Sequence, residues 1–239
     1  MLSKRPLLLL AAVASTGLIA AGCGSNEDQD TSTAANSGTS TQMESGSSTE
    51  TQNTSAEGTE TGSAELRATL THGLNEHVYL AGIAVKQGVD NGLDSKQFKA
   101  AAGTLDGNSK ALAEAIGSVY GPDAGEQFLA LWRAHIGMFV DYTKGKATND
   151  SKLVDKAVED LDGYRAEFGA FLESANPNLT QDAVAEELKP HVASLSAAID
   201  SVVAGKGDAF DKLREAAGHM PQTANVLAGA IVKQSPEKF

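Results

Sequence analysis

Apolar residues recur every three to four positions through most of the chain after residue 65, which is the spacing of amphipathic helices. Six segments follow this spacing, and none shows the sustained alternation with hairpin turns that is typical of half-buried strands. The segments cover residues 66–84, 101–116, 128–142, 153–171, 184–199 and 210–227. The sequence therefore predicts an all-α fold, a six-helix bundle over residues 65–239.

Two breaks in the pattern mark helix ends. Gly121-Pro122-Asp123 precedes the third segment, and a proline after a turn residue is a common helix start. Asn176-Pro177-Asn178 separates the fourth segment from the fifth. These breaks agree with the six predicted helices.

The two halves of this region also align with each other. Residues 74–82 lie over 161–169, and residues 112–118 lie over 195–201. In the same register His77 lies over Tyr164, and Asn108 over His191. We predict a duplicated three-helix unit, with one repeat over residues 65–148 and the second over 149–239.

The first 22 residues have a different pattern. Lys4 and Arg5 precede an uncharged, mostly apolar run, and small residues lead from it to Cys23. This is the layout of a secretory signal peptide, and the run is shorter than the ~20 residues that a transmembrane helix needs. Small residues directly before a cysteine resemble the lipobox of bacterial lipoproteins. Cys23 is the only cysteine of the chain, so it has no disulfide partner within it.

We therefore predict a lipoprotein signal peptide over residues 1–22 and an acyl anchor of the palmitate class on Cys23. The alternative is plain secretion with Cys23 unmodified. The predicted location is the outer face of the bacterial cytoplasmic membrane, where the acyl chains bind the lipid.

Residues 23–64 separate this signal from the helices. After Cys23 they are mainly Ser, Thr, Gly, Gln, Asn and Ala, with seven acidic residues and no Lys or Arg. Such a segment buries too little apolar surface to offset the entropy of ordering it. We predict a disordered tether that holds the helical domain away from the membrane.

The charge balance bears on partners. The chain carries 31 acidic and 19 basic residues, a formal net charge of −12, and no basic stripe is evident. Nucleic-acid binding is therefore not expected, and the predicted partners are the membrane, a metal ion or another envelope protein.

Four stretches carry a resemblance to known proteins: AIGSVYG at 115–121, LWRAHI at 131–136, SANPNL at 174–179 and REAAGHM at 214–220. They resemble a group of exported helical proteins and lipoproteins from Gram-positive-type bacteria, over nearly all of residues 65–239. The resemblance implies an all-helical fold and an extracytoplasmic location, and it assigns no activity and no site residue.

The predicted helices contain five histidines, His72, His77, His135, His191 and His219. His77, His135 and His191 fall on the apolar stripes of their helices. Burying a polar side chain costs free energy unless it has a partner, so something must satisfy these imidazoles.

One interpretation is a transition-metal site, because side chains from facing helices converge in the core of a bundle. Imidazole suits copper and zinc, and a thioether favours Cu(I). We predict a copper or zinc class site made by His77, His135, His191 and His219, with Glu76, Met138 and Met220 in support. His72 and Glu76, four residues apart, form another possible pair.

Two other interpretations stay open. The histidines are purely structural, hydrogen-bonded to Glu76, Asn108, Tyr164 or water, in a scaffold or protein-interaction module of the envelope. Alternatively, one histidine holds haem or another apolar ligand, with walls formed by Trp132, Phe139 and Tyr142. No catalytic residue is predicted, because the chain has no Gly-x-Ser-x-Gly elbow, Walker loop or HExxH motif, and we do not expect an enzyme.

Overall fold

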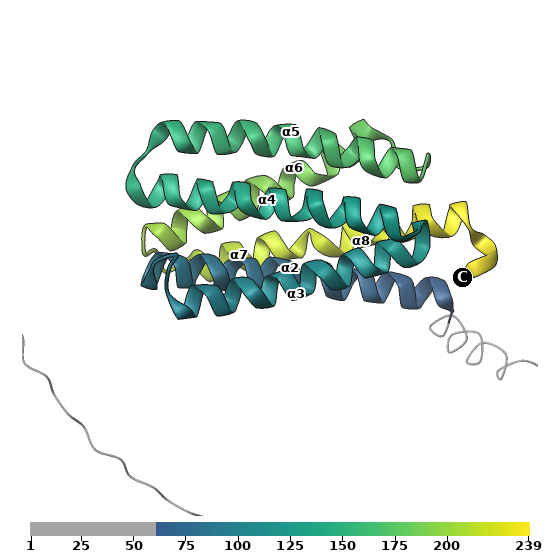
Figure 1. Ribbon diagram of the computed structural model, residues 1–239, viewed down its shortest axis with the longest axis horizontal. Helices are drawn as coiled ribbons and strands as arrows, with labels where there is room; N and C mark the ends of the chain where they lie inside the picture. The colour runs from purple at the N-terminus through teal and green to yellow at the C-terminus, as the bar shows by residue number, and fades with distance from the viewer. Residues whose placement is uncertain (1–60) are drawn as a thin grey trace, which may run out of the picture. The chain divides into compact units, whose positions relative to one another are not determined.

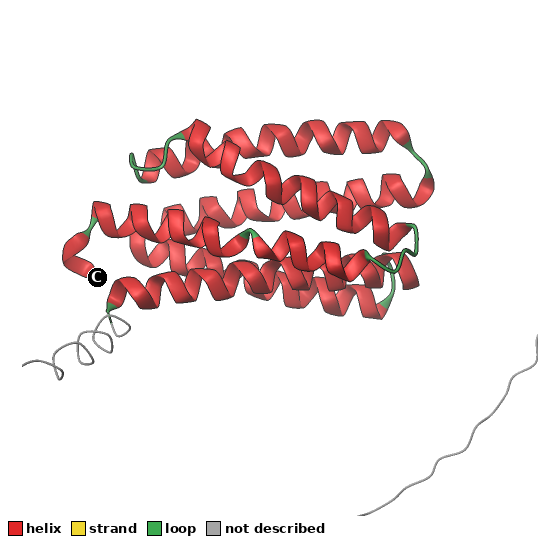
Figure 2. Cartoon of the chain, turned by 180° about the vertical axis from the view of Figure 1, so that it is seen from behind, coloured by secondary structure: helices red, strands yellow, loops and turns green. Residues whose placement is uncertain are grey.

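The structure is a computed structural model that describes residues 61–239. Within these residues the chain is helical and contains no strand (Figure 2), so the predicted all-α bundle is confirmed. The elements are α2 (Gly62–Asn91), α3 (Lys96–Tyr120), α4 (Pro122–Thr148), α5 (Ser151–Ala175), α6 (Gln181–Val203), α7 (Ala209–Gly218), α8 (Met220–Gln234) and the 3₁₀ helix η1 (Pro236–Lys238).

The helix starts follow from local sequence. Thr61, Ser95, Asp150 and Thr180 stand at the N-caps of α2, α3, α5 and α6, where each side chain accepts a hydrogen bond from a backbone N–H three residues further on. Such caps satisfy donors that a helix cannot satisfy itself. The turn between α3 and α4 needs Gly121, whose φ is +98°, followed by Pro122 in the first turn of α4, as the 121–123 break predicts.

The first five predicted helices lie within α2 to α6, and α7 and α8 together take the place of the sixth. The two meet at His219. Pro221, in the first turn of α8, has no N–H to donate to the carbonyl four residues earlier, and its ring crowds that carbonyl. The periodicity of residues 210–227 continues through this break, which is why the sequence pattern did not show it.

Successive helices α2 to α6 run back and forth, and α7 with α8 returns beside α2 (Figure 1). α2 is the central element, since it packs against α3, α4, α6, α7 and α8. The core is continuous between these helices and includes Leu74 and Val78 of α2, Leu161 of α5 and Ile199 of α6. Histidine side chains on the inner face of α2 are therefore surrounded by other helices.

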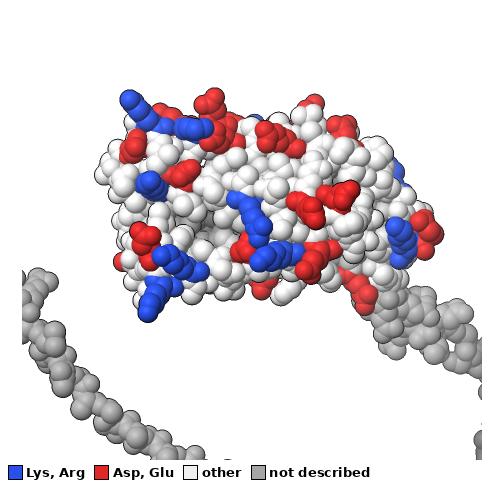
Figure 3. Space-filling view, viewed as in Figure 1, with Lys and Arg blue, Asp and Glu red and all other residues white. Residues whose placement is uncertain are grey.

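The surface is mixed in charge. On the face drawn in Figure 3, Lys and Arg side chains alternate with Asp and Glu, and no extended single-sign area appears there. Several pairs are formed by neighbours on one helix, such as Lys156 with Asp160 at 2.7 Å. None of the helices in residues 61–239 combines the length and the hydropathy needed to cross a bilayer.

Three predictions fall outside the described residues: the signal peptide over residues 1–22, the lipid on Cys23 and nearly all of the tether over 23–64. The predicted boundary between the repeats, at residue 149, coincides with the end of α4. Asn149 has φ +56° there and terminates the helix.

Candidate metal centre

Three histidines on three different helices lie in the interior of the bundle. His77 on α2, His135 on α4 and His191 on α6 are 2%, 4% and 7% exposed. Each follows a buried apolar residue by three positions, and these residues are Leu74, Trp132 and Leu188. Each histidine therefore lies on the inward face of its helix. Helix packing thus brings together three imidazoles that are 58 and 56 residues apart in sequence.

His77 and His135 face each other. Their Nε2 atoms are 3.3 Å apart, and their ring centroids are 5.3 Å apart. Trp132 flanks both imidazoles, with its ring centroid 4.7 Å from that of His77 and 4.6 Å from that of His135. Tyr164 of α5 stacks on His135 at 4.8 Å. Aromatic rings therefore hold the orientation of the pair.

Hydrogen bonding satisfies these imidazoles only in part, since the facing Nε2 atoms of His77 and His135 are within hydrogen-bond distance of each other. The Nδ1 atoms of His77, His135 and His191 are buried and have no hydrogen-bond partner within residues 61–239. The side chains expected as hydrogen-bond partners make other contacts. Asn108 donates to the Gly73 carbonyl at 3.0 Å and to Glu76 at 2.8 Å. Tyr164 contacts His135 by ring stacking. An unsatisfied buried polar atom costs about 1–3 kcal/mol.

The three histidines line one cavity of about 40 Å³. This exceeds the roughly 10–15 Å³ that a water molecule or small ion requires and is far below the roughly 300 Å³ of small-molecule pockets. Haem, the apolar-ligand alternative, does not fit in this arrangement of the helices. A second cavity of about 40 Å³ lies on the other side of His77 and His135 and is lined mainly by apolar side chains.

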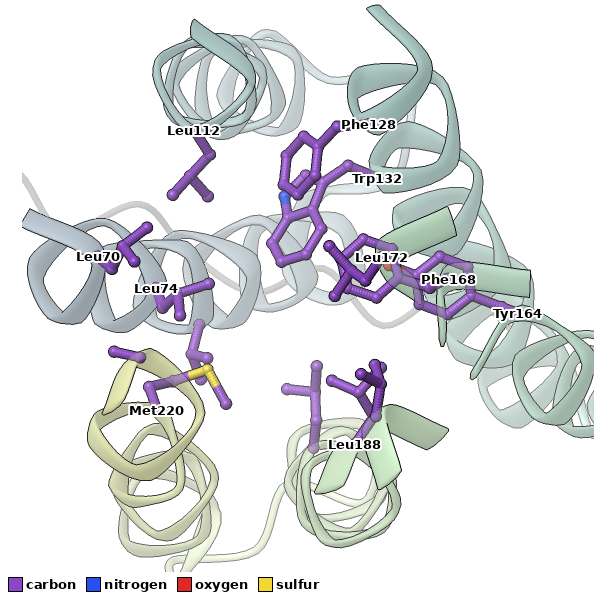
Figure 4. Close-up of a cluster of buried hydrophobic side chains, with 14 of the residues drawn as sticks. Leu70, Leu74, Leu112, Phe128, Trp132, Tyr164, Phe168, Leu172, Leu188 and Met220 are labelled. Atoms are coloured by element: carbon purple, nitrogen blue, oxygen red, sulfur yellow. The ribbon is translucent and has the colours of Figure 1, made fainter. Parts of the chain in front are cut away.

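Figure 4 shows the interior that surrounds this cavity. Met220 reaches inward from α8, opposite Trp132 of α4, and Leu188 closes the space from α6. Thr223 of α8 also lines the cavity. All lining side chains are uncharged when the histidines are neutral, so the cavity contributes donor atoms without formal charge.

Burial keeps the histidines neutral. It lowers the pKa of His77 to about 3, with a further contribution from His191, and lowers the pKa of His191 to about 4 against an opposing effect of the Ala216 carbonyl. The pKa of His135 is also lowered well below its ordinary value, by burial first and then by His77 and His191. At neutral pH each imidazole therefore has one nitrogen lone pair free of a proton.

Of the predicted site residues, the structure brings together His77, His135, His191 and Met220. The others lie elsewhere. Glu76 is exposed on the outside of α2 and accepts the hydrogen bond from Asn108. Met138 is half-buried and packs against the core without lining the cavity.

His219 is half-buried at the break between α7 and α8 and does not line the cavity, although it is near enough to His191 to lower its pKa further. His72 is exposed. The predicted convergence of four imidazoles is therefore realised only in part. Within residues 61–239, no group of three or more His, Cys, Asp or Glu residues lies in an arrangement that would hold a metal ion, so any site consists of the histidine pair and additional donors.

Sequence reasoning missed part of this environment. Trp132 was expected only as a wall for an apolar ligand, yet it contacts both imidazoles of the pair. Tyr164 gave a usable signal, because it aligns with His77 in the predicted repeat. For Thr223 the sequence gave no signal beyond its place on the apolar stripe of α8.

Comparison with known proteins adds no assignment: no protein family model, no curated protein and no solved structure matches this chain.

Proposed function

We propose that this protein is a membrane-anchored extracytoplasmic helical binding protein that holds a transition-metal ion of the copper or zinc class between His77 and His135. The observation that carries the proposal is the 3.3 Å separation of the two facing Nε2 atoms, which is also a hydrogen-bond distance. Two imidazole nitrogens bound to one ion at about 2.0–2.1 Å with a tetrahedral angle lie roughly 3.3 Å apart. The pair therefore has the spacing of one edge of a metal site.

The state of the imidazoles supports this role. Metal ligands must be deprotonated to bind, and burial keeps all three histidines neutral at physiological pH. His191 lines the same cavity and is the third imidazole there. The aromatic rings of Trp132 and Tyr164 hold the pair in place, as residues around a metal site commonly do for its ligands.

The arrangement of the site also fits the proposed duplication. Positions 77 and 164, which align between the repeats, both contact His135. A duplicated unit would place its equivalent helices around a common axis, where both copies contribute to one interior site. We propose this as the origin of the centre.

A second candidate function rests on the surface. Tyr79 and Ile83, one turn apart on α2, are 43% and 49% exposed, and Phe210 of α7 is 65% exposed. α7 packs against α2, so these residues belong to neighbouring helices. Exposed apolar groups of this kind mark protein contacts when they are contiguous, and they favour the scaffold or protein-interaction alternative with structural histidines.

The test is metal binding by the full chain in mild detergent, with Cys23→Ser as the background so that the only thiol is absent. Cu, Zn, Ni and Fe ions are titrated by equilibrium dialysis. His135→Leu removes one donor of the pair, and His72→Leu makes the same change at an exposed histidine as the matched control. Circular dichroism verifies that both variants stay helical.

We expect about one ion per chain, with affinity reduced in His135→Leu by more than the roughly 10- to 100-fold that loss of a supporting group causes. His72→Leu should bind as the parent does. Equal binding by all three chains, or binding no tighter than that of an unrelated acidic protein, would refute the metal function and favour the scaffold.

A further inference from the structure

We infer that the histidine cavity selects monovalent copper over divalent ions, with the Met220 thioether as a third donor. This inference rests on the proposed metal function and specifies which ion is bound. Three independent features of the cavity support it: the charge of its lining, the kinds of donor atom and the aromatic ring beside the pair.

The charge of the lining disfavours divalent ions. None of the side chains around the cavity is a carboxylate or a thiolate. Glu187 accepts a hydrogen bond from the lining residue Thr223 at 3.4 Å but is not itself part of the lining. An ion in this cavity keeps its charge without compensation. Because the cost of transferring an ion from water rises with the square of its charge, a divalent ion pays about four times as much as a monovalent one.

The donor atoms are those that Cu(I) prefers. Met220 is 3% exposed and lines the same cavity as His77 and His135. Figure 4 shows its sulfur directed into the bundle from α8. Imidazole suits both copper and zinc, but thioether sulfur selects soft ions such as Cu(I). The imidazoles and the thioether are all neutral donors, whereas structural zinc sites usually include charged thiolates, so the donor set favours Cu(I).

The aromatic environment favours the same ion. Trp132 lies within 5 Å of both imidazoles, with centroids 4.7 and 4.6 Å away, so it borders any ion held between them. A tryptophan face attracts a cation within about 6 Å of its centroid. Trp132 and the two histidines are all buried, at 7%, 2% and 4% exposure, so an ion held between the imidazoles would lie away from solvent.

The experiment compares Cu(I) with Zn(II) on the full chain carrying Cys23→Ser. Cu(I) is supplied under anaerobic conditions in competition with bicinchoninate, and Zn(II) is titrated against a colorimetric chelator. Trp132 is the only tryptophan, so its fluorescence reports on the surroundings of the histidine pair. Met220→Leu removes the thioether at nearly constant volume, and Met138→Leu is the matched control away from the cavity.

We expect Cu(I) to quench Trp132 at about one ion per chain and to bind more tightly than Zn(II). Met220→Leu should weaken Cu(I) binding at least about tenfold while leaving the helical signal and any Zn(II) binding unchanged, and Met138→Leu should change neither. Zn(II) binding that equals or exceeds Cu(I) binding and disappears in His135→Leu would overturn this inference and leave the metal function standing. Cu(I) binding unaffected by Met220→Leu would overturn the role of the thioether. Absence of both ions would overturn the inference together with the proposed function.

Discussion

His135 is the residue around which the interior is organised. Its ring contacts those of His77, Trp132, Phe139 and Tyr164, so it links α2, α4 and α5. An imidazole in this position stays neutral only because protonation would place a charge among apolar rings. Its protonation therefore depends on whether the chain is folded.

The metal-free protein should lose stability in acid below the ordinary histidine pKa. The folded-state pKa is about 3 for His77 and about 4 for His191, against 6.5 in an unfolded chain, and that of His135 is also lowered. The unfolded chain thus binds more protons between pH 6.5 and about 4, so the stabilisation is complete above pH 6.5 and is lost as the pH falls. Each histidine contributes up to about 1.4 kcal/mol per pH unit in this window. Thermal unfolding followed by circular dichroism from pH 8 to pH 4 measures the slope.

Two variants test whether buried histidines cause the dependence of stability on pH. His135→Leu should make it shallower by about one proton, and His72→Leu should leave it unchanged because His72 is exposed. A slope that His135→Leu does not change would contradict the burial of a neutral imidazole in the core.

The sequence pattern predicted that His77, His135 and His191 are buried. Its prediction that Glu76 and Met138 support them at the site was wrong, for geometric reasons. Positions on an apolar stripe point inward, which is true of residues 77, 135 and 191. Glu76 is adjacent to His77, and neighbouring residues on a helix point about 100° apart, so it cannot face the same cavity. Met138 is three residues beyond His135, rotated by about 60° and raised by about 4.5 Å, and packs beside the site instead.

At the scale of helices, two prolines shape the walls of the centre. Pro190 precedes His191 within α6 and has no N–H to donate to Glu186, so α6 lacks one backbone hydrogen bond beside its histidine. Pro221 separates α7 from α8, and the break turns Met220 inward while His219 stays at the boundary. The existence of the helices was predictable from periodicity, but this break was not, because the apolar pattern runs through it.

Close approach of α5 and α6 depends on Gly169. A Cβ at this position would lie 2.4 Å from the Gln181 carbonyl oxygen, which is backbone and cannot rotate away, whereas a Cβ at Gly163 of the same helix would meet nothing within 4 Å. We expect Gly169→Ala to destabilise the protein by about 1–3 kcal/mol. Gly163→Ala should stabilise it by roughly 0.5–1 kcal/mol, because alanine favours the helix.

Urea unfolding of the two variants and the parent measures these effects. The pair of changes is chemically identical and differs only in what surrounds the new methyl group. Equal effects of the two substitutions would show that α5 and α6 do not approach as closely as the structure places them.

At the scale of the whole molecule, we propose that a lipid on Cys23 and a tether carry the bundle outside the cell. The net charge of −12 disfavours binding to anionic lipid, and the face drawn in Figure 3 carries mixed charges, so we expect membrane attachment to depend on the anchor. We predict that Cys23→Ser moves the protein from the membrane fraction and abolishes incorporation of labelled palmitate in a bacterial host. Persistence of the label in Cys23→Ser would place the lipid elsewhere, and absence of label from the parent would favour plain secretion.

The most direct test of the central claim is the metal content of the protein as isolated from the cell envelope. Mass-spectrometric elemental analysis of the parent should find about one transition-metal ion per chain, and the His77→Leu variant, which removes the other donor of the pair, should contain almost none while remaining folded. Equal metal content in the two proteins, or no metal in the parent after supplementation of the medium with copper and zinc, would contradict a metal centre at the histidine pair.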